Sequence, residues 1–474
     1  MINAFQSNAL SLLLGVSFIL NSCAPAKQLT TEVQSLNSNQ KAYVQALIES
    51  GKVPDPDQVI PSDVSNSCQD FIKSLPSDYL RDTMLVPENK NDPNSPMIQI
   101  FYYGKIFSGK APVVFFNGGP GSDSHSSFRI LSDKLKAKMW FQKISFIYID
   151  QRGNGCSSPY PQGSDDATLE RLKFYGSRQI VDDAEALRVK LIGDRPWKAF
   201  GQSYGAFIVH RYATLYPSKL TAAYAHAGVI TSSPLERLKG RILSQERVMK
   251  IYLQQYPEDE ASLRAINTYL SGKCFKDEAS SASGCGLYVI DDFGKFLGFT
   301  DEWPRIHKWI QVVVPKNEVD EVGLKKYLQT IYFSNEVDPK NNKSAAKAVI
   351  DFVDRNVLEL THENCAMIGV DLANSLLNEC KQPLLDAPRL LSPRTLKIQS
   401  FAQDFLTLAD FKSTLQSSAL KFHLYSGEND TFVPKEIYPE ELEATKGLVI
   451  YTHFMKSGHD GFYTESQVWD DVRK

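Results

Sequence analysis

One pentapeptide, Gly201-Gln202-Ser203-Tyr204-Gly205, constrains the fold of this chain more than any other stretch. It follows a short apolar run at 197–200 and precedes a longer one at 206–213. This order predicts a buried strand, a sharp turn carrying Ser203, and an amphipathic helix, which is the arrangement of a nucleophile elbow. A turn this tight excludes side-chain bulk on both sides of a strained serine, which explains the two glycines. The helix N-terminus favours developing negative charge. Such a pentapeptide also arises by chance, so the assignment of a nucleophile elbow depends on further motifs in the chain.

Composition describes a globular protein and excludes some classes of function. The chain has 474 residues, of which 42% are hydrophobic and 23% charged, enough for a large core. Its net charge of −3, with no stripe of Lys or Arg, argues against nucleic-acid binding. The eight histidines lack the paired spacings of a metal site. We therefore expect no metal, no other cofactor and no nucleic-acid partner.

The N-terminal stretch predicts export. Ala9 to Leu20 is an apolar run of signal-peptide length, too short to span a bilayer. It ends in Leu20-Asn21-Ser22-Cys23, which resembles the lipobox of bacterial lipoproteins, although residues 1–8 contain no Lys or Arg. The resemblance implies a signal peptide over 1–22, lipidation of Cys23 and anchoring in the bacterial cell envelope, periplasmic or outer membrane. Secretion after an ordinary signal peptide is the first alternative, and a buried N-terminal helix the second.

Cysteine usage agrees with an oxidising compartment. The chain has seven cysteines, and setting aside Cys23 leaves six, an even number. Two pairs are close enough in sequence to bond locally, Cys274 with Cys285 and Cys365 with Cys380. The remaining two, Cys68 and Cys156, are either a third disulfide or free buried thiols.

Alternating strand and helix patterns predict an α/β domain interrupted by an insertion. Helical patterns at 166–191 and 204–216 lie between apolar strand-like runs that do not alternate, as in a mostly parallel sheet covered by helices on both faces. The expected strands are 82–87, 97–103, 112–116, 145–150, 198–201, 220–227, 420–425 and 448–455. Between 232 and 417 the pattern is helical throughout, which indicates a cap.

These patterns divide the chain into five segments. They are a signal peptide (1–22), a polar tether with one short helix at 40–50 (23–67), the first part of the core (68–231), a helical cap (232–417) and the second part of the core (418–474).

Two later strand ends supply the partners that an acyl-transfer serine needs, namely a base and a carboxylate that orients it. Asp430 follows the strand at 420–425, and His459 follows the strand at 448–455. The carboxyl ends of parallel strands share one edge of a sheet, so Ser203, Asp430 and His459 are expected to meet there. Each residue alone is also explained by a turn or a helix cap, and Glu428 and Asp460 are rival acids.

A glycine-rich loop, Asn117-Gly118-Gly119-Pro120-Gly121, follows another predicted strand. Its glycines let backbone N–H groups approach a substrate oxygen, as in an oxyanion hole. A phosphate-binding loop is the alternative. The proline removes a donor and no lysine follows at the spacing that phosphate would require, which disfavours it.

Together with Asp150-Gln151-Arg152-Gly153 and the helix at 182–188, these motifs resemble the prolyl aminopeptidase branch of the α/β-hydrolases over residues 80–230 and 420–474. The resemblance implies an α/β-hydrolase fold with an inserted helical cap. It implies Ser203 as nucleophile, His459 as base, Asp430 as its orienter, and the N–H groups of Gly119 and Tyr204 as the oxyanion hole. Asn117 stands where the family usually has His, so we expect altered loop packing there.

The cap departs from the family pattern where the substrate's free amine would bind. The segment 293–307 looks like the family's cap segment, in which a Glu helps to hold that amine, but the matching position is Pro304. Asp301 or Glu302 then becomes the candidate amine ligand, and the Trp303 ring the candidate cover for a pyrrolidine. Solvated charges in the first turn of a helix are the structural alternative.

The resulting hypothesis is an exported, lipid-anchored serine hydrolase, an aminopeptidase that releases N-terminal residues, proline among them, from peptides through an acyl-enzyme on Ser203. Its expected partners are a peptide or small acyl substrate and, through the lipid anchor, a membrane. An esterase of the same fold and a catalytically silent surface-binding lipoprotein are the alternatives.

Overall fold

A computed structural model describes residues 59–60, 66–125, 127–128, 144–161, 165–230, 234–270, 274–276, 283–285, 297–315, 318–328 and 406–474. The predicted signal peptide, Cys23, the helix at 40–50 and the Cys365/Cys380 pair lie outside these residues. In the part of the chain that the structure describes, no helix is both long and apolar enough to cross a membrane.

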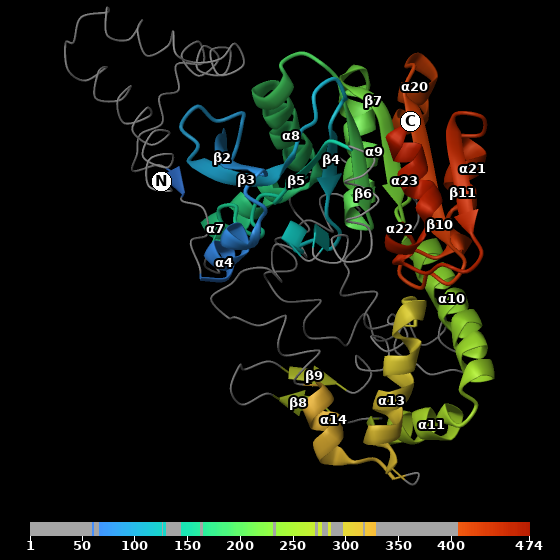
Figure 1. Cartoon of the computed structure of the whole chain (residues 1–474). Helices are drawn as coiled ribbons and strands as arrows, with labels where there is room; N and C mark the ends of the chain where they lie inside the picture. The colour runs from blue at the N-terminus through green and yellow to red at the C-terminus, as the bar shows by residue number, and fades with distance from the viewer. Residues whose placement is uncertain are drawn as a thin grey trace, which may run out of the picture.

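The centre of the fold is a nine-stranded sheet in the order β1-β3-β5-β4-β6-β7-β10-β11, with β2 also paired to β3 (Figure 1). Its strands are β1 (Val59–Ile60), β2 (Leu80–Pro87), β3 (Met97–Lys105), β4 (Val113–Phe116), β5 (Phe146–Ile149), β6 (Trp197–Gln202), β7 (Leu220–His226), β10 (Lys421–Gly427) and β11 (Val449–Phe454). From β5 to β11 along this order all neighbours are parallel, whereas β3 is antiparallel to β2 and β5. The predicted mostly parallel sheet is confirmed.

Helices cover both faces of the sheet, which explains the continuous apolar strands. On one face lie α8 (Ser177–Ile192), α9 (Tyr204–Leu215) and α20 (Leu408–Ser417), packed around strand residues such as Val114 and Ala223. On the other lie α4 (Asn66–Ser74) and α23 (Ser466–Arg473), packed against aromatic strand residues such as Phe115.

Several elements differ from the sequence-based expectation. The helix expected over 166–191 is α7 (Asp166–Leu172), a 3-10 turn η2 (Lys173–Tyr175) and α8, because Gly176 between them is extended. Helix α20, assigned above to the cap, packs on α9 in the core. Helix α4 straddles the tether boundary and is fastened to the core by a Cys68–Cys156 disulfide, which answers the choice left open for that pair.

The described cap elements are α10 (Pro234–Gln255), α11 (Asp259–Leu270), the 3-10 turn η4 (Thr300–Glu302), α13 (Trp303–Val313) and α14 (Glu321–Leu328). A hairpin of β8 (Cys274–Lys276) and β9 (Ser283–Cys285) departs from the all-helical expectation, since three-residue strands leave no detectable periodicity. Its register sets Cys274 opposite Cys285, and their disulfide stays a prediction.

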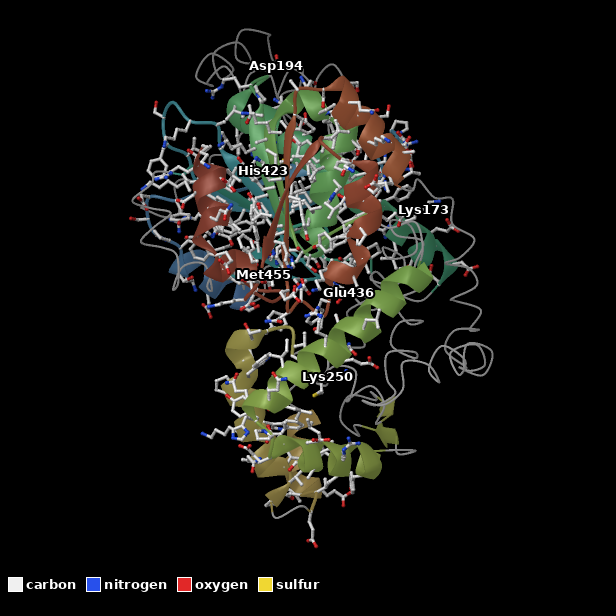
Figure 2. The ribbon with its side chains drawn as sticks, turned by 90° about the vertical axis from the view of Figure 1, so that its right-hand side faces the viewer. Lys173, Asp194, Lys250, His423, Glu436 and Met455 are labelled. Atoms are coloured by element: carbon white, nitrogen blue, oxygen red, sulfur yellow. A yellow bond between two sulfur atoms is a disulfide. The ribbon has the colours of Figure 1, made fainter. Side chains whose placement is uncertain are left out.

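The cap faces the carboxyl edge of the sheet. Figure 2 shows Asp194, which precedes β6, at the end of the core far from the cap, and Met455, which follows β11, at the end near it. Helix α10 runs from this near end, beside Glu436, down into the cap (Figure 2). The turns that carry the predicted site therefore lie between the core and the cap.

Candidate active site

Ser203 occupies the turn between β6 and α9 with φ 58° and ψ −121°, a conformation that side-chain-bearing residues rarely adopt. A Cβ on Gly201 would lie 2.0 Å from the Gly205 carbonyl oxygen, and one on Gly205 2.0 Å from the Phe116 oxygen. Both glycines are thus sterically required, as predicted. The Ser203 backbone N–H donates to the carbonyl of His226 at 2.9 Å, which fixes the turn to β7.

Asp430 and His459 meet at the carboxyl edge of the sheet, where the sequence placed them. The His459 Nδ1 lies 2.9 Å from Asp430 Oδ2. The other carboxylate oxygen accepts the backbone N–H groups of Phe432 and Val433, each at 2.9 Å. Asp430 is fully buried, and its carboxylate is held on both oxygens in a position to orient the imidazole. The side chain of Gln202 donates to the His459 carbonyl at 3.3 Å, which brings this turn beside the elbow.

The rival acid Glu428 is engaged elsewhere. Its carboxylate pairs with His453 at 2.8 Å, Lys435 at 2.6 Å and Arg247 at 3.3 Å. Partial burial raises the pKa of Glu428, but the hydrogen bonds from Lys435 and His453 more than offset this, so its pKa is lowered. Asp460, the other rival, begins the short helix α22 (Gly461–Thr464) as its N-cap residue. The geometry therefore favours Asp430, and the catalytic roles stay predictions.

The glycine loop lies directly against the elbow. A Cβ on Gly118 would come within 3.1 Å of the Ser203 Cβ, and Gly119 has φ 112°. Asn117 holds the loop from below, since its amide donates to the Asp123 carbonyl and accepts from Ser127 at 2.6 Å. That this packing differs from that of a family member with His at this position stays a prediction. The assignment of the Gly119 and Tyr204 N–H groups as oxyanion donors fits the approach of loop to elbow.

The motif Asp150-Gln151-Arg152-Gly153 stabilises the same loop. Asp150 is fully buried and accepts from Ser124 Oγ at 2.6 Å, from the Cys156 N–H at 2.8 Å and from His125 Nε2 at 2.9 Å. Burial raises the pKa of Asp150, but the hydrogen bonds from His125 and Ser124 outweigh it and the pKa is lowered. Arg152, in the same motif, forms a bidentate salt bridge with Asp183, with N···O distances of 2.8 and 2.7 Å. The motif thus acts as a scaffold.

One group of potential metal ligands lies close together among the described residues. It comprises His125, Asp150 and Cys156, whose ligand atoms lie within 4.8 Å of one another. The Cys156 sulfur is bonded to Cys68, and the carboxylate of Asp150 already accepts several hydrogen bonds. We therefore assign this group to the scaffold of the loop.

His226, at the end of β7, was not singled out from the sequence. Its ring is fully buried, and neither nitrogen has a hydrogen-bond partner among the described protein atoms. It lies beneath the turn that carries His459, because a Cβ on Gly461 would be 2.9 Å from its Nε2 and its ring contacts Phe462. Burial, with a contribution from the charge of His459, lowers the pKa of His226 to about 3. A polar residue ending an apolar strand at the site edge was the signal that could have revealed it.

The two predicted amine-binding residues whose side chains are described, Glu302 and Trp303, are engaged in other contacts. Glu302 pairs with Arg305 at 2.5 Å and is 40% exposed. The Trp303 ring is buried in the core of the cap, where its indole N–H donates to the Leu297 carbonyl at 2.9 Å. Packing thus accounts for Trp303, and the side chain of Asp301 lies outside the described part of the structure. Their role in substrate binding stays a prediction.

Sequence comparison shows which known proteins this chain is similar to. Residues 111–246 match the family model of the alpha/beta hydrolase fold. The chain is 25% identical over 179 residues to a proline iminopeptidase of Aspergillus aculeatus, 27% over 168 residues to one of Aeromonas sobria and 33% over 110 residues to one of Xylella fastidiosa. These matches cover 33%, 33% and 23% of this chain and 38%, 38% and 30% of the relatives. The similar region is less than two fifths of each relative's length.

Proposed function

We propose that this chain, which has the alpha/beta hydrolase fold and is similar to proline iminopeptidases over 33% of its length, is a serine aminopeptidase that releases N-terminal residues, proline among them, from peptides. The observation that carries the proposal is the buried hydrogen bond between His459 and Asp430, beside the strained turn of Ser203. A surface-binding protein has no need of a carboxylate–imidazole pair held in this way.

In the proposed mechanism, Ser203 Oγ attacks the carbonyl carbon of the N-terminal residue while His459 takes its proton. Asp430 holds the imidazole through Nδ1 and stabilises the imidazolium that forms. The N–H groups of Gly119 and Tyr204 receive the negative charge of the tetrahedral oxygen. The imidazolium then protonates the leaving amine. Water hydrolyses the acyl-enzyme in turn: His459 takes a proton from the water as it attacks, and then returns a proton to Ser203 Oγ as the acyl group leaves.

A matched substrate panel tests this proposal. It contains the p-nitroanilides of proline and alanine, the same anilides with an acetylated amine, and p-nitrophenyl acetate. We expect turnover of the free-amine anilides and little of the acetylated ones. A desolvated ammonium needs a carboxylate partner in the enzyme, and an acetylated amine is neutral and cannot pair with that carboxylate. Turnover of the ester alone would make the protein an esterase. No turnover of any substrate together with no fluorophosphonate labelling would indicate a binding protein.

Glu302 provides the second arm of this experiment. If its carboxylate leaves Arg305 to bind the substrate amine, Glu302→Gln lowers kcat/KM for the free-amine anilides and spares p-nitrophenyl acetate. The control is Arg305→Gln, which removes the competing cation and keeps the carboxylate. Equal losses on anilide and ester, or none on either, would show that the amine is held elsewhere.

We further propose that the protein is exported and anchored to a membrane of the cell envelope through lipidated Cys23, on the strength of Leu20-Asn21-Ser22-Cys23. Two or more acyl chains anchor a protein stably, so Cys23→Ser is expected to move it out of the membrane fraction. Mass spectrometry of the native N-terminus checks the proposal directly, and an unmodified Cys23 or an intact signal segment would contradict it.

A further inference from the structure

A short cap segment, Leu297-Gly298-Phe299, lies against the turn of His459, and we call it the strap. The His459 backbone N–H donates to the Gly298 carbonyl at 2.9 Å. The approach is close, since a Cβ on the neighbouring Gly458 would lie 1.7 Å from that same oxygen. The backbone of the predicted base is therefore held by the cap as well as by the core.

The strap also closes one side of the imidazole. The Phe299 ring meets His459 edge to face, with centroids 5.8 Å apart at 89°. Phe432 stacks on the same imidazole at 4.7 Å and 27°, and the two phenyl rings contact each other at 5.3 Å. Phe432 also donates its backbone N–H to Asp430. These contacts restrict rotation of the imidazole about its side-chain bonds while Asp430 fixes Nδ1.

The strap is itself anchored in the core of the cap. Leu297 is fully buried in the cluster formed by α10 and α13, and its carbonyl accepts the indole N–H of Trp303. Trp303 packs edge to face on Tyr252 of α10 at 5.6 Å. A continuous path of packed groups thus runs from α10 through Trp303 and Leu297 to the N–H of His459.

We propose that the strap is a positioning element for the general base, so that the cap contributes to the chemical step and does not only select substrates. This inference rests on the proposed serine-hydrolase function. Misplacing a catalytic group by about 1 Å can cost about a hundredfold in rate. Loosening the strap should therefore lower kcat, whereas loss of a mere substrate contact would raise KM.

Phe299→Ala tests the ring contact and Phe299→Leu restores an apolar side chain in its place. We expect the alanine variant to lose about 10- to 100-fold in kcat with KM little changed, and the leucine variant to recover most of the loss. The rate at which diethyl p-nitrophenyl phosphate inactivates Ser203 should fall in parallel, because this small reagent needs the base but not a substrate pocket.

Gly458→Ala tests the backbone contact separately. Gly458 does not have a positive φ, so alanine meets the Gly298 oxygen rather than backbone strain, and the strap must move away. The same loss of kcat and of inactivation rate is expected. The matched control is Tyr256→Ala, which removes a ring of the same cap cluster that packs on His307 and on Tyr252. Its inactivation rate should equal that of the wild type.

The outcomes separate this inference from the proposed function. If the wild type is not inactivated at Ser203, the serine-hydrolase function fails. If the wild type is inactivated and both Phe299→Ala and Gly458→Ala react at its rate, the strap does not position the base. A loss in Tyr256→Ala as large as in Phe299→Ala would show a general effect of cap stability, and it would overturn the strap's specific role. If Gly458→Ala does not fold, the Phe299 pair decides alone.

Discussion

Replacement of Ser203 by alanine is expected to abolish turnover, with a loss in kcat of about 10⁴- to 10⁶-fold. Alanine fits the turn sterically as well as serine does, so the fold should be kept while the nucleophile is removed. The measurement is the steady-state rate on the best anilide of the panel, beside fluorophosphonate labelling. A variant that is still labelled at an active-site serine, or that keeps turnover, would show that the nucleophile lies elsewhere.

The acid can be assigned in the same assay with a matched pair of variants. Asp430→Asn keeps the shape of the side chain but removes the charge that orients His459, and a loss of about 10⁴-fold is expected. Glu428→Gln makes the same chemical change two residues earlier, where the carboxylate pairs with Lys435 and His453, and should stay within about tenfold of the wild type. The reverse ranking would make Glu428 the orienting acid.

Acid is expected to destabilise the fold through His226. The folded pKa of about 3 lies below the ordinary value of 6.5, so the unfolded chain binds the proton more readily between these two values. His226 therefore causes no loss of unfolding free energy above pH 6.5. As the pH is lowered from 6.5 toward 3, the unfolding free energy falls by about 1.4 kcal/mol per pH unit because of this group. Below the folded pKa no further loss arises from this group.

Urea unfolding at pH 7, 6, 5 and 4, followed by intrinsic tryptophan fluorescence, measures this effect, since two of the five tryptophans, Trp197 and Trp469, are buried in the core. His226→Leu and His226→Asn cannot take up the proton, so both should show a flatter dependence of the unfolding free energy on pH than the wild type. The two variants will differ in unfolding free energy at pH 7, since only Asn keeps a polar group in the buried site. Variants that retain the full acid slope would mean that other groups cause it.

The arrangement of Ser203, Asp430 and His459 was predictable because parallel strands bring their carboxyl ends to one edge. The choice among Asp430, Glu428 and Asp460 was not, because all three stand in turns at that edge. The Phe432 and Val433 N–H groups that hold Asp430 depend on the course of the backbone. Side-chain direction was equally hidden for Trp303, whose place in a helix start is compatible with either a pocket or the cap core.

His226 shows another limit of sequence reasoning. An apolar strand that ends in histidine predicts burial, but a pattern does not show whether the ring finds a partner. The strap was missed for a related reason. Gly298 acts through its backbone carbonyl and Gly458 through the absence of a side chain, and neither contribution leaves a chemical signature in the residue type.

The disulfide of helix α4 has a practical consequence for anyone who produces the protein. Cys68 and Cys156 are separated by 88 residues, and closing a loop of that length contributes about 4–5 kcal/mol in the chain-entropy model. A reducing bacterial cytoplasm would leave this bond unformed, and α4 would be held largely by packing such as Phe71 on His125. Yield and activity from such a host would then reflect its redox chemistry as much as the sequence, and periplasmic or oxidising expression is the appropriate starting point.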